Sequence, residues 1–270
     1  MLLRDRFWLW GHPEGLYNNR YGNEGISRMT PMEGCLYLGV PNVFMVPVGS
    51  RQVNRRQYNK SFKTLHNVGW DCYRSGCGVE KVEPIITEAA EFPNISCAVF
   101  DDFKQIDGRA EDESSKVTVD KLWKIRERLK HNEVRSLDMW MVLYTFEFGV
   151  NQDVDKEFIP FLEPFDGIIM WTWEEKDVPL IPEKFEIFKK MTPNNRRMFG
   201  CYLYNFGEKK QATGEAVKWQ LDWYREKIYA GEAEGVVLHT NTMADLDYEA
   251  YDVACEWMAK HGDEIVPDIK

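Results

Sequence analysis

The chain contains no long hydrophobic run and no excess of positive charge. No stretch approaches the ~20 consecutive apolar residues that a membrane-spanning helix needs, so the sequence predicts no such helix. The chain has 34 lysines and arginines against 44 aspartates and glutamates, which gives a formal net charge of −10. Nucleic acids and anionic membrane surfaces attract cationic proteins, so we expect neither as a partner.

Cysteine pairing motifs and a signal segment are also missing. The six cysteines contain no CxxC pair, which favours free thiols that pack as small hydrophobic side chains in a reducing, cytoplasmic compartment. Residues 1–6 lead almost directly into an apolar run, so the sequence predicts no secretory signal, although a signal removed in processing is compatible with it.

Short apolar runs recur along all 270 residues at a spacing of about 30, and each precedes a stretch with helical periodicity. Eight strand-then-helix units in about 250 residues are typical of a closed parallel barrel. The sequence therefore predicts the α/β class, with residues 1–270 forming one (β/α)8 TIM barrel domain. The expected strands are residues 7–12, 42–48, 68–74, 95–103, 137–147, 167–174, 197–205 and 235–241.

Several polar residues and prolines mark where the expected helices begin. Pro31 and Pro182 suit the first turn of a helix, because proline needs no amide hydrogen-bond partner there. Thr118, Thr213 and Asp245 are expected N-caps of the helices that follow the fourth, seventh and eighth strands.

The strand ends carry most of the residues with chemical potential. In a barrel of this class the active site lies at the C-terminal ends of the strands, so these side chains should meet in one cup, with residues 14–25 as a rim or lid. The expected set is Trp10, His12, Glu14, Arg51, Trp70, Asp71, Arg74, Asp101, Asp102, Tyr144, Glu147, Trp173, Glu174, Glu175, Tyr202, Tyr204, Asn205, His239 and Asn241.

Alternation along two strands selects a carboxylate pair from this set. Ser96 and Ala98 share a strand face with Asp102, and a small or polar face suits the barrel interior. Thr172 shares a face with Glu174 for the same reason. We therefore expect Asp102 and Glu174 to open into the cup, with Asp101 and Glu175 in reserve.

Two carboxylates in an aromatic cup are the equipment of glycoside hydrolysis, in which one acid protonates the leaving oxygen and the other attacks or activates water. We expect Asp102 as nucleophile or base, Glu174 as general acid, a small neutral or weakly charged carbohydrate as substrate, and no cofactor. The expected sugar platforms are Trp10, Trp173, Tyr202 and Tyr204; the expected hydroxyl-binding residues are His12, Arg74, Asn205, His239 and Asn241.

An acid that ends the fourth strand and another that ends the sixth resemble the arrangement in barrel glycosidases of the alpha-galactosidase and alpha-fucosidase kind. That resemblance implies a nucleophile at Asp102 and an acid/base at Glu174. Residues 98–103, 171–174 and 200–207 also resemble a family of uncharacterised bacterial barrel proteins grouped with glycosidases. Barrel glycosidases with acids on strands four and seven are poor models, because the seventh strand here ends in Tyr202, Tyr204 and Asn205.

Two other classes of protein remain open. His12 and His239 end neighbouring strands, and with Glu14, Asp102 or Glu147 they could hold a divalent metal in a sugar isomerase or hydrolase. The chain has only five histidines and no HxH pair, which makes this the second hypothesis. The third is a non-catalytic carbohydrate-binding barrel.

Overall fold

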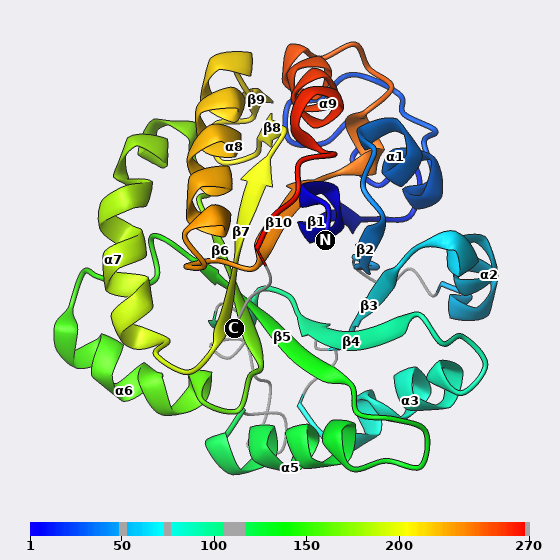
Figure 1. Cartoon of the computed structure of the whole chain (residues 1–270), viewed down its shortest axis with the longest axis vertical. Helices are drawn as coiled ribbons and strands as arrows, with labels where there is room; N and C mark the ends of the chain where they lie inside the picture. Colours follow the sequence, from blue (N-terminus) through cyan, green and yellow to red (C-terminus); the bar gives the residue numbers. More distant parts are fainter. Residues whose placement is uncertain (49–52, 73–76, 105–116, 268–270) are drawn as a thin grey trace.

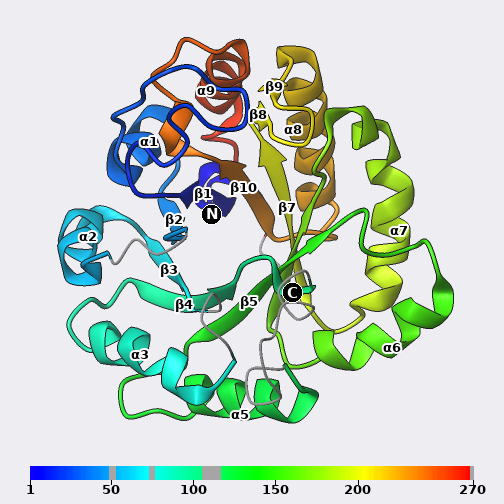
Figure 2. The ribbon, with the colours of Figure 1, turned by 180° about the vertical axis from the view of Figure 1, so that it is seen from behind.

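The structure is a computed structural model that describes residues 1–48, 53–72, 77–104 and 117–267. These residues form a closed barrel of parallel strands in the order β1-β10-β7-β6-β5-β4-β3-β2. Helices surround the strands on all sides (Figure 1), and the view from behind shows the same ring (Figure 2). The predicted (β/α)8 barrel is confirmed.

Each barrel strand is followed by a helix that packs on the outside. The barrel strands are β1 (Phe7–Gly11), β2 (Asn42–Met45), β3 (Asn67–Asp71), β4 (Ile95–Phe100), β5 (Asp138–Tyr144), β6 (Gly167–Trp171), β7 (Arg196–Tyr202) and β10 (Gly235–His239). The helices are α1 (Pro31–Leu38), α2 (Arg55–Ser61), α3 (Glu83–Ala89), α5 (Val119–Lys130), α6 (Gln152–Leu162), α7 (Ile181–Met191), α8 (Gly214–Tyr229) and α9 (Glu249–His261). A small antiparallel pair, β8 (Tyr204–Asn205) and β9 (Lys210–Gln211), follows β7.

Most of the predicted helix starts are confirmed. Pro31 and Pro182 lie in the first turns of α1 and α7. The hydroxyl oxygens of Thr118 and Thr213 accept N–H groups from the first turns of α5 and α8, which satisfies donors that have no partner within the helix. The expected cap at Asp245 is wrong, because α9 begins four residues later and the Asp245 carboxylate instead accepts the backbone N–H of Arg28 at 3.1 Å.

Alternate residues of each strand pack in two separate layers. On β1, Phe7 and Leu9 join the layer between strands and helices, while Trp8 and Trp10 join a cluster inside the barrel. The interior cluster consists of Trp8, Trp10, Phe44, Val46, Cys97, Val99, Trp140, Val142, Tyr144, Ile169, Trp171, Met198 and Val237. The barrel interior is therefore unusually aromatic.

Glycines on neighbouring strands make room for these large rings. Trp140 lies beside Gly167 in the β5–β6 register, and a Cβ on Gly167 would lie 2.2 Å from the Trp140 ring. On β7, a Cβ on Gly200 would lie 1.9 Å from Cδ2 of Trp171. Neither contact is possible for a real Cβ, so each indole requires the glycine beside it.

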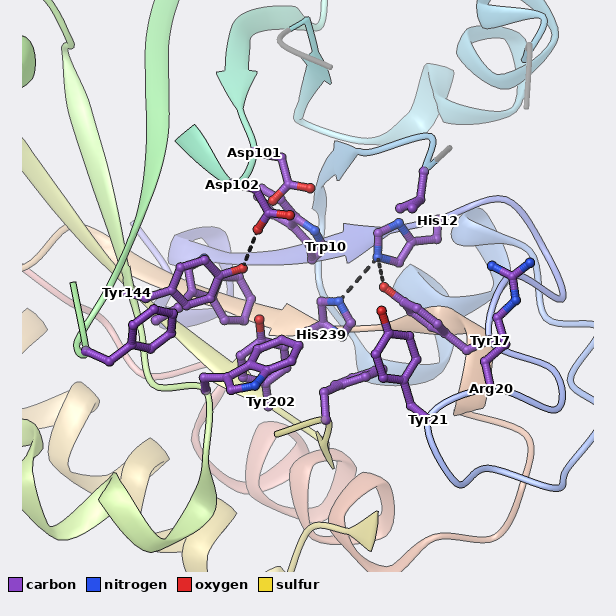
Figure 3. A pocket seen from close by; sticks show the side chains of 15 residues that line it. Trp10, His12, Tyr17, Arg20, Tyr21, Asp101, Asp102, Tyr144, Tyr202 and His239 are labelled. Carbon is purple, nitrogen blue, oxygen red and sulfur yellow. Dashed lines mark hydrogen bonds between the residues drawn. The ribbon is translucent and has the colours of Figure 1, made fainter. Parts of the chain in front are cut away.

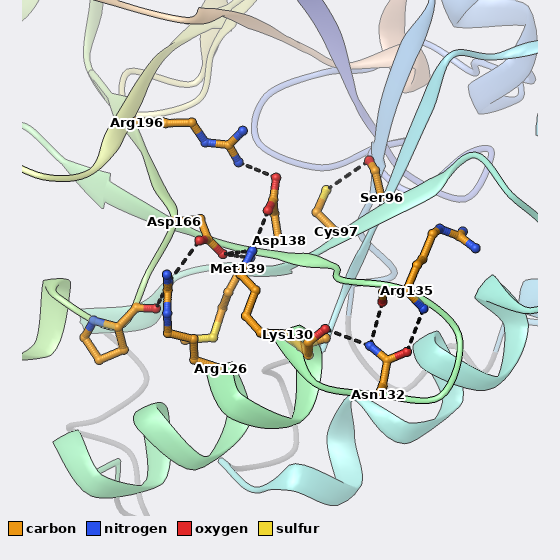
Figure 4. A network of polar contacts seen from close by, with 12 residues as sticks. Ser96, Cys97, Arg126, Lys130, Asn132, Arg135, Asp138, Met139, Asp166 and Arg196 are labelled. Atoms are coloured by element: carbon orange, nitrogen blue, oxygen red, sulfur yellow. Dashed lines mark hydrogen bonds and ion pairs between the residues drawn. The ribbon is translucent and has the colours of Figure 1, made fainter. Parts of the chain in front are cut away.

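A network of charged side chains lies at the N-terminal end of the barrel (Figure 4). Asp138, at the start of β5, accepts a hydrogen bond from Lys130 at 2.7 Å and forms an ion pair with Arg196. Asp166 pairs with Lys130 and Arg126, each at 3.0 Å, and accepts the backbone N–H of Met139. Burial alone would raise the pKa of Asp138, but the two cations outweigh burial and lower it.

Within the described ranges, no helix has the length and apolar character needed to cross a membrane.

The Gly200→Ala substitution should destabilise the protein by about 1–3 kcal/mol, because the added methyl group overlaps the Trp171 ring inside a closely packed barrel. Adding Trp171→Leu should make the combined loss smaller than the sum of the two single losses, since the smaller side chain relieves the overlap. Urea denaturation of the single and double variants measures both effects. Strictly additive losses would contradict the packing argument.

Candidate functional site

A cavity of about 490 Å³ opens at the C-terminal ends of the barrel strands. Its walls come from the ends of several strands and from the loop after β1, as the close-up shows (Figure 3). The lining side chains are Trp10, His12, Tyr17, Arg20, Tyr21, Val48, Asp101, Asp102, Tyr144, Phe146, Trp171, Trp173, Tyr202, Phe206 and His239.

The structure brings together only part of the predicted site. The predicted residues that line the cavity are Trp10, His12, Asp101, Asp102, Tyr144, Trp173, Tyr202 and His239. Those that do not line it are Glu14, Trp70, Asp71, Glu147, Glu174, Glu175, Tyr204, Asn205 and Asn241. Arg74 and Arg51 lie outside the described residues.

Both aspartates after β4 face the cavity, although the predicted strand face was wrong. Cys97 and Val99 point into the barrel, whereas Ala98 and Phe100 pack toward the helices. The face with Ser96 and Ala98 also carries Phe100, whose ring packs against Phe165 at 5.2 Å, while the interior is already filled by rings from other strands. Asp101 continues the inward face, and Asp102 has a φ of 49°, a left-handed conformation outside the alternation of the strand.

The predicted orientation of β6 is also wrong. Ile169 and Trp171 point inward and Trp173 continues to the cavity, so Glu174 falls on the other side. The Glu174 carboxylate forms an ion pair with Lys176 instead of facing Asp102. The reserve residue Glu175 is engaged as well, since it accepts the backbone N–H of Thr213 at 2.8 Å.

Two buried tyrosines lie beside Asp102 in the cavity. The Tyr144 hydroxyl donates to Oδ1 of Asp102 at 2.8 Å, and Tyr202 lines the same cavity. Burial raises the pKa of both phenols well above 10, and the nearby aspartates add to this effect. Both tyrosines therefore stay protonated and can donate hydrogen bonds, as Tyr144 does to the carboxylate of Asp102.

Two histidines meet on the other side of the cavity. His12 Nδ1 donates to the Val46 carbonyl at 2.6 Å, which leaves its Nε2 as an acceptor when the ring is neutral. That Nε2 lies 3.2 Å from Nε2 of His239 and 3.2 Å from the Tyr17 hydroxyl. Burial, and then the neighbouring His12, lower the pKa of His239 well below 6.5, so His239 is neutral at pH 7.

Asn241 supports this corner instead of lining the cavity. Its side chain accepts the His12 backbone N–H at 2.8 Å and donates to the carbonyls of His12 and Met29 at 3.0 and 2.7 Å. All of its polar atoms are thus used in joining the end of β1 to the residues after β10, and Asn241 is fully buried.

Tyr204 and Asn205 have structural contacts too. The Tyr204 hydroxyl donates to the Tyr21 carbonyl at 2.9 Å, and its ring stacks on Tyr248 at 5.9 Å. Asn205 hydrogen-bonds both the backbone and the side chain of Glu208. These two residues hold the loop after β1 and the turn after β8.

The residues that the sequence analysis missed come mainly from loops and from the reversed face of β6. Tyr17, Arg20 and Tyr21 lie in the segment expected as a rim. The sequence does not give the path of this segment, so it could not show which of its side chains face the cavity. Trp171 was excluded by the wrong strand face. Val48, Phe146 and Phe206 follow strands and carry no polar signal that would have selected them.

No group of three His, Cys, Asp or Glu side chains in the described residues is arranged to hold a metal ion. Of the three carboxylates considered as partners of His12 and His239, two form hydrogen bonds elsewhere. Glu14 accepts the Tyr58 hydroxyl at 3.1 Å, and Glu147 accepts the Tyr144 backbone N–H at 2.8 Å. Burial raises the pKa of Glu147 to about 7.

Sequence comparison finds no matching family model and no matching curated protein. Solved structures that resemble the chain include active domain 2 of the Pyrococcus furiosus chitinase, with a TM-score of 0.61 and 10% identity over 97% of each chain. An alpha-L-arabinofuranosidase from Thermotoga maritima has a TM-score of 0.57 and 9% identity over 94% of this chain and 70% of that one. A tryptophan synthase chain from M. tuberculosis has a TM-score of 0.51 and 9% identity over 96% and 94%.

At these identities the likeness shows the fold alone. The expected resemblance to barrel glycosidases holds at that level, because two of these three barrels are named as enzymes of carbohydrates. The third is named for a different reaction, so the fold does not select the activity.

The buried, neutral His239 should make folding stability depend on pH. The unfolded chain takes up a proton at this residue below pH 6.5, whereas the native state does not, so this contribution is full above pH 6.5 and is lost as the pH falls. The slope from one such group is at most about 1.4 kcal/mol per pH unit. His239→Gln should therefore lose less stability than the wild type between pH 7.5 and 5.0 in urea denaturation.

A matched control is His131→Gln, because the His131 side chain is 76% exposed. This variant should keep the pH dependence of the wild type. An unchanged pH dependence in His239→Gln would show that His239 is protonated in the native protein.

Proposed function

We propose that the protein is a glycoside hydrolase that acts on a small carbohydrate, with Asp101 and Asp102 as its acid–base pair. The observation that carries this proposal is that both adjacent carboxylates line one aromatic cavity at the C-terminal mouth of the barrel. Active sites of (β/α)8 enzymes lie at this mouth. Glycoside hydrolysis needs a proton donor for the leaving oxygen and a second carboxylate for the anomeric centre or for water.

The aromatic walls suit a sugar. Trp10, Trp173, Tyr202 and Phe206 present ring surfaces to the cavity, and the rings of Trp173 and Phe206 are close to parallel at 28°. A pocket with apolar walls and a few placed polar groups is typical of small-molecule sites. The ring carbons of a sugar can lie on these faces while its hydroxyls reach the imidazoles and phenols.

The hydrogen bonds divide the roles of the two aspartates. Asp102 accepts a hydrogen bond from the Tyr144 hydroxyl. This contact suits an ionised carboxylate that attacks the anomeric carbon or removes a proton from water. Asp101 then serves as the general acid, giving its proton to the glycosidic oxygen as the bond to the anomeric carbon breaks. This role passes to Asp101 because Glu174 is ion-paired with Lys176 outside the cavity.

The structural comparisons support the substrate class only through the fold. The chitinase structure is described as complexed with chito-oligosaccharides, and the arabinofuranosidase structure as an arabinose complex. Two other proteins with a similar barrel are thus described as bound to sugars. The assignment here depends on the carboxylates and rings of this chain.

Asp102→Asn and Asp101→Asn should each lower kcat/KM on a cleavable nitrophenyl glycoside by about a thousandfold or more, because each removes a carboxylate needed in the transition state. Both should fold with a small change in Tm, since strand-end residues at a catalytic mouth contribute little to core packing. The measurement is a panel of nitrophenyl glycosides with the wild type, followed by kinetics of both variants on the best substrate.

The matched control is Glu174→Gln. It removes a carboxylate that follows β6 and lies outside the cavity. It should keep near-normal activity. Loss of activity in Glu174→Gln with normal activity in Asp101→Asn would return the general acid role to Glu174. Binding of sugars without any hydrolysis across the panel would instead favour a carbohydrate-binding barrel.

A further inference from the structure

The cavity has a separation of charge across its width. Asp101 and Asp102 line one side, and Arg20 is the one lysine or arginine among its described lining residues. His239 adds no positive charge there, because burial lowers its pKa well below 6.5. In Figure 3, Arg20 lies on the far side of His12 from the two aspartates.

A tight turn holds Arg20 at this edge. The Asn23 backbone N–H donates to the Arg20 carbonyl at 2.9 Å, and Arg20 and Asn23 form an isolated antiparallel bridge. The two residues between them, Tyr21 and Gly22, have φ values of 53° and 78°. Positive φ at both central positions is typical of a type I′ turn.

The turn is itself anchored to another part of the barrel mouth. The Tyr204 hydroxyl donates to the Tyr21 carbonyl at 2.9 Å. Gly22 packs so closely on the chain that a Cβ there would lie 2.4 Å from the Lys209 carbonyl oxygen. The backbone that carries Arg20 is therefore preformed, which lowers the entropic cost of using this side chain for binding.

The guanidinium of Arg20 forms no ion pair with a carboxylate of the described residues. Arg28 and Arg55 likewise form no ion pair there, whereas Arg128 pairs with Glu83 and Arg225 pairs with Glu264, each at 2.6 Å. Arg20 differs from Arg28 and Arg55 because it lines the cavity. Arg20 is thus a cation at the cavity, and the described residues supply no carboxylate that pairs with it.

We propose that the substrate carries a carboxylate, as a uronic acid residue does, and that Arg20 binds this group. This inference rests on the proposed glycoside hydrolysis and names its substrate class. The flat guanidinium matches a carboxylate with two parallel hydrogen bonds. A single negative charge suits one arginine beside two aspartates, whereas a phosphate, with a charge near −2 at pH 7, would meet stronger repulsion.

The test compares the binding of matched sugar pairs to the intact wild-type protein by calorimetry. The pairs are D-glucuronate with D-glucose and D-galacturonate with D-galactose, which differ only in the carboxylate; glucose 6-sulfate tests another monoanion. At least one uronate should bind about tenfold or more tightly than its neutral partner, and added salt should reduce this difference.

Three variants locate the effect. Arg20→Gln should weaken uronate binding about tenfold to a hundredfold, because a charged hydrogen-bonded pair is lost. Arg20→Lys should show an intermediate loss, since it keeps the charge without the fork. Arg28→Gln, an exposed arginine of the same loop that does not line the cavity, should bind as the wild type does.

Each contrary result has a distinct meaning. Equal binding of uronates and neutral sugars, or equal losses in Arg20→Gln and Arg28→Gln, overturns the role of Arg20 and leaves the proposed hydrolysis standing. Binding of the sulfate in preference to both uronates overturns the carboxylate as the recognised group. Failure of every sugar to bind overturns this inference, and if no glycoside in the nitrophenyl panel is cleaved, the proposed function fails as well.

Discussion

The packing of large aromatic rings against glycines inside the barrel determines the rest of the structure. Trp140 and Trp171 occupy space that any side chain at Gly167 or Gly200 would fill. These contacts leave β5, β6 and β7 one possible orientation, because a shift by one residue would exchange the interior and exterior faces of a strand. The residues that continue each interior face beyond the strand end then become the walls of the cavity.

The aromatic interior also sets the electrostatic character of the site. Tyr144 and Tyr202 stand at the top of the interior layer, where burial raises their pKa and keeps them protonated. His239 is neutral for the same reason. Among the described lining residues, the other polar groups beside the two aspartates are thus neutral, apart from the guanidinium of Arg20 at the edge of the cavity. The proposed substrate would therefore be oriented mainly by hydrogen bonds within the cavity, with one charged contact at its rim.

Much of the fold and about half of the site could be predicted from the sequence. The repeated apolar runs are local patterns, and so are the caps at Thr118 and Thr213, which explains their agreement with the structure. The faces of β4 and β6 were assigned from their own residues, with small and polar side chains placed inside. That reasoning failed because the interior is filled by rings from other strands, and Trp171 fits there only beside Gly200 on β7.

The sequence by itself determined the barrel, its strand ends and the presence of Asp101, Asp102, Trp10, His12 and His239 at those ends, because strand and helix periodicity depend on neighbouring residues. Only the tertiary structure decided that Glu174 pairs with Lys176, that Asn241 holds the backbone of His12, and that Arg20 reaches the cavity. These outcomes depend on which residues from distant strands and loops lie beside one another. The physical reason is that a strand-end side chain takes whichever partner the closed barrel brings within reach, and that partner is remote in sequence.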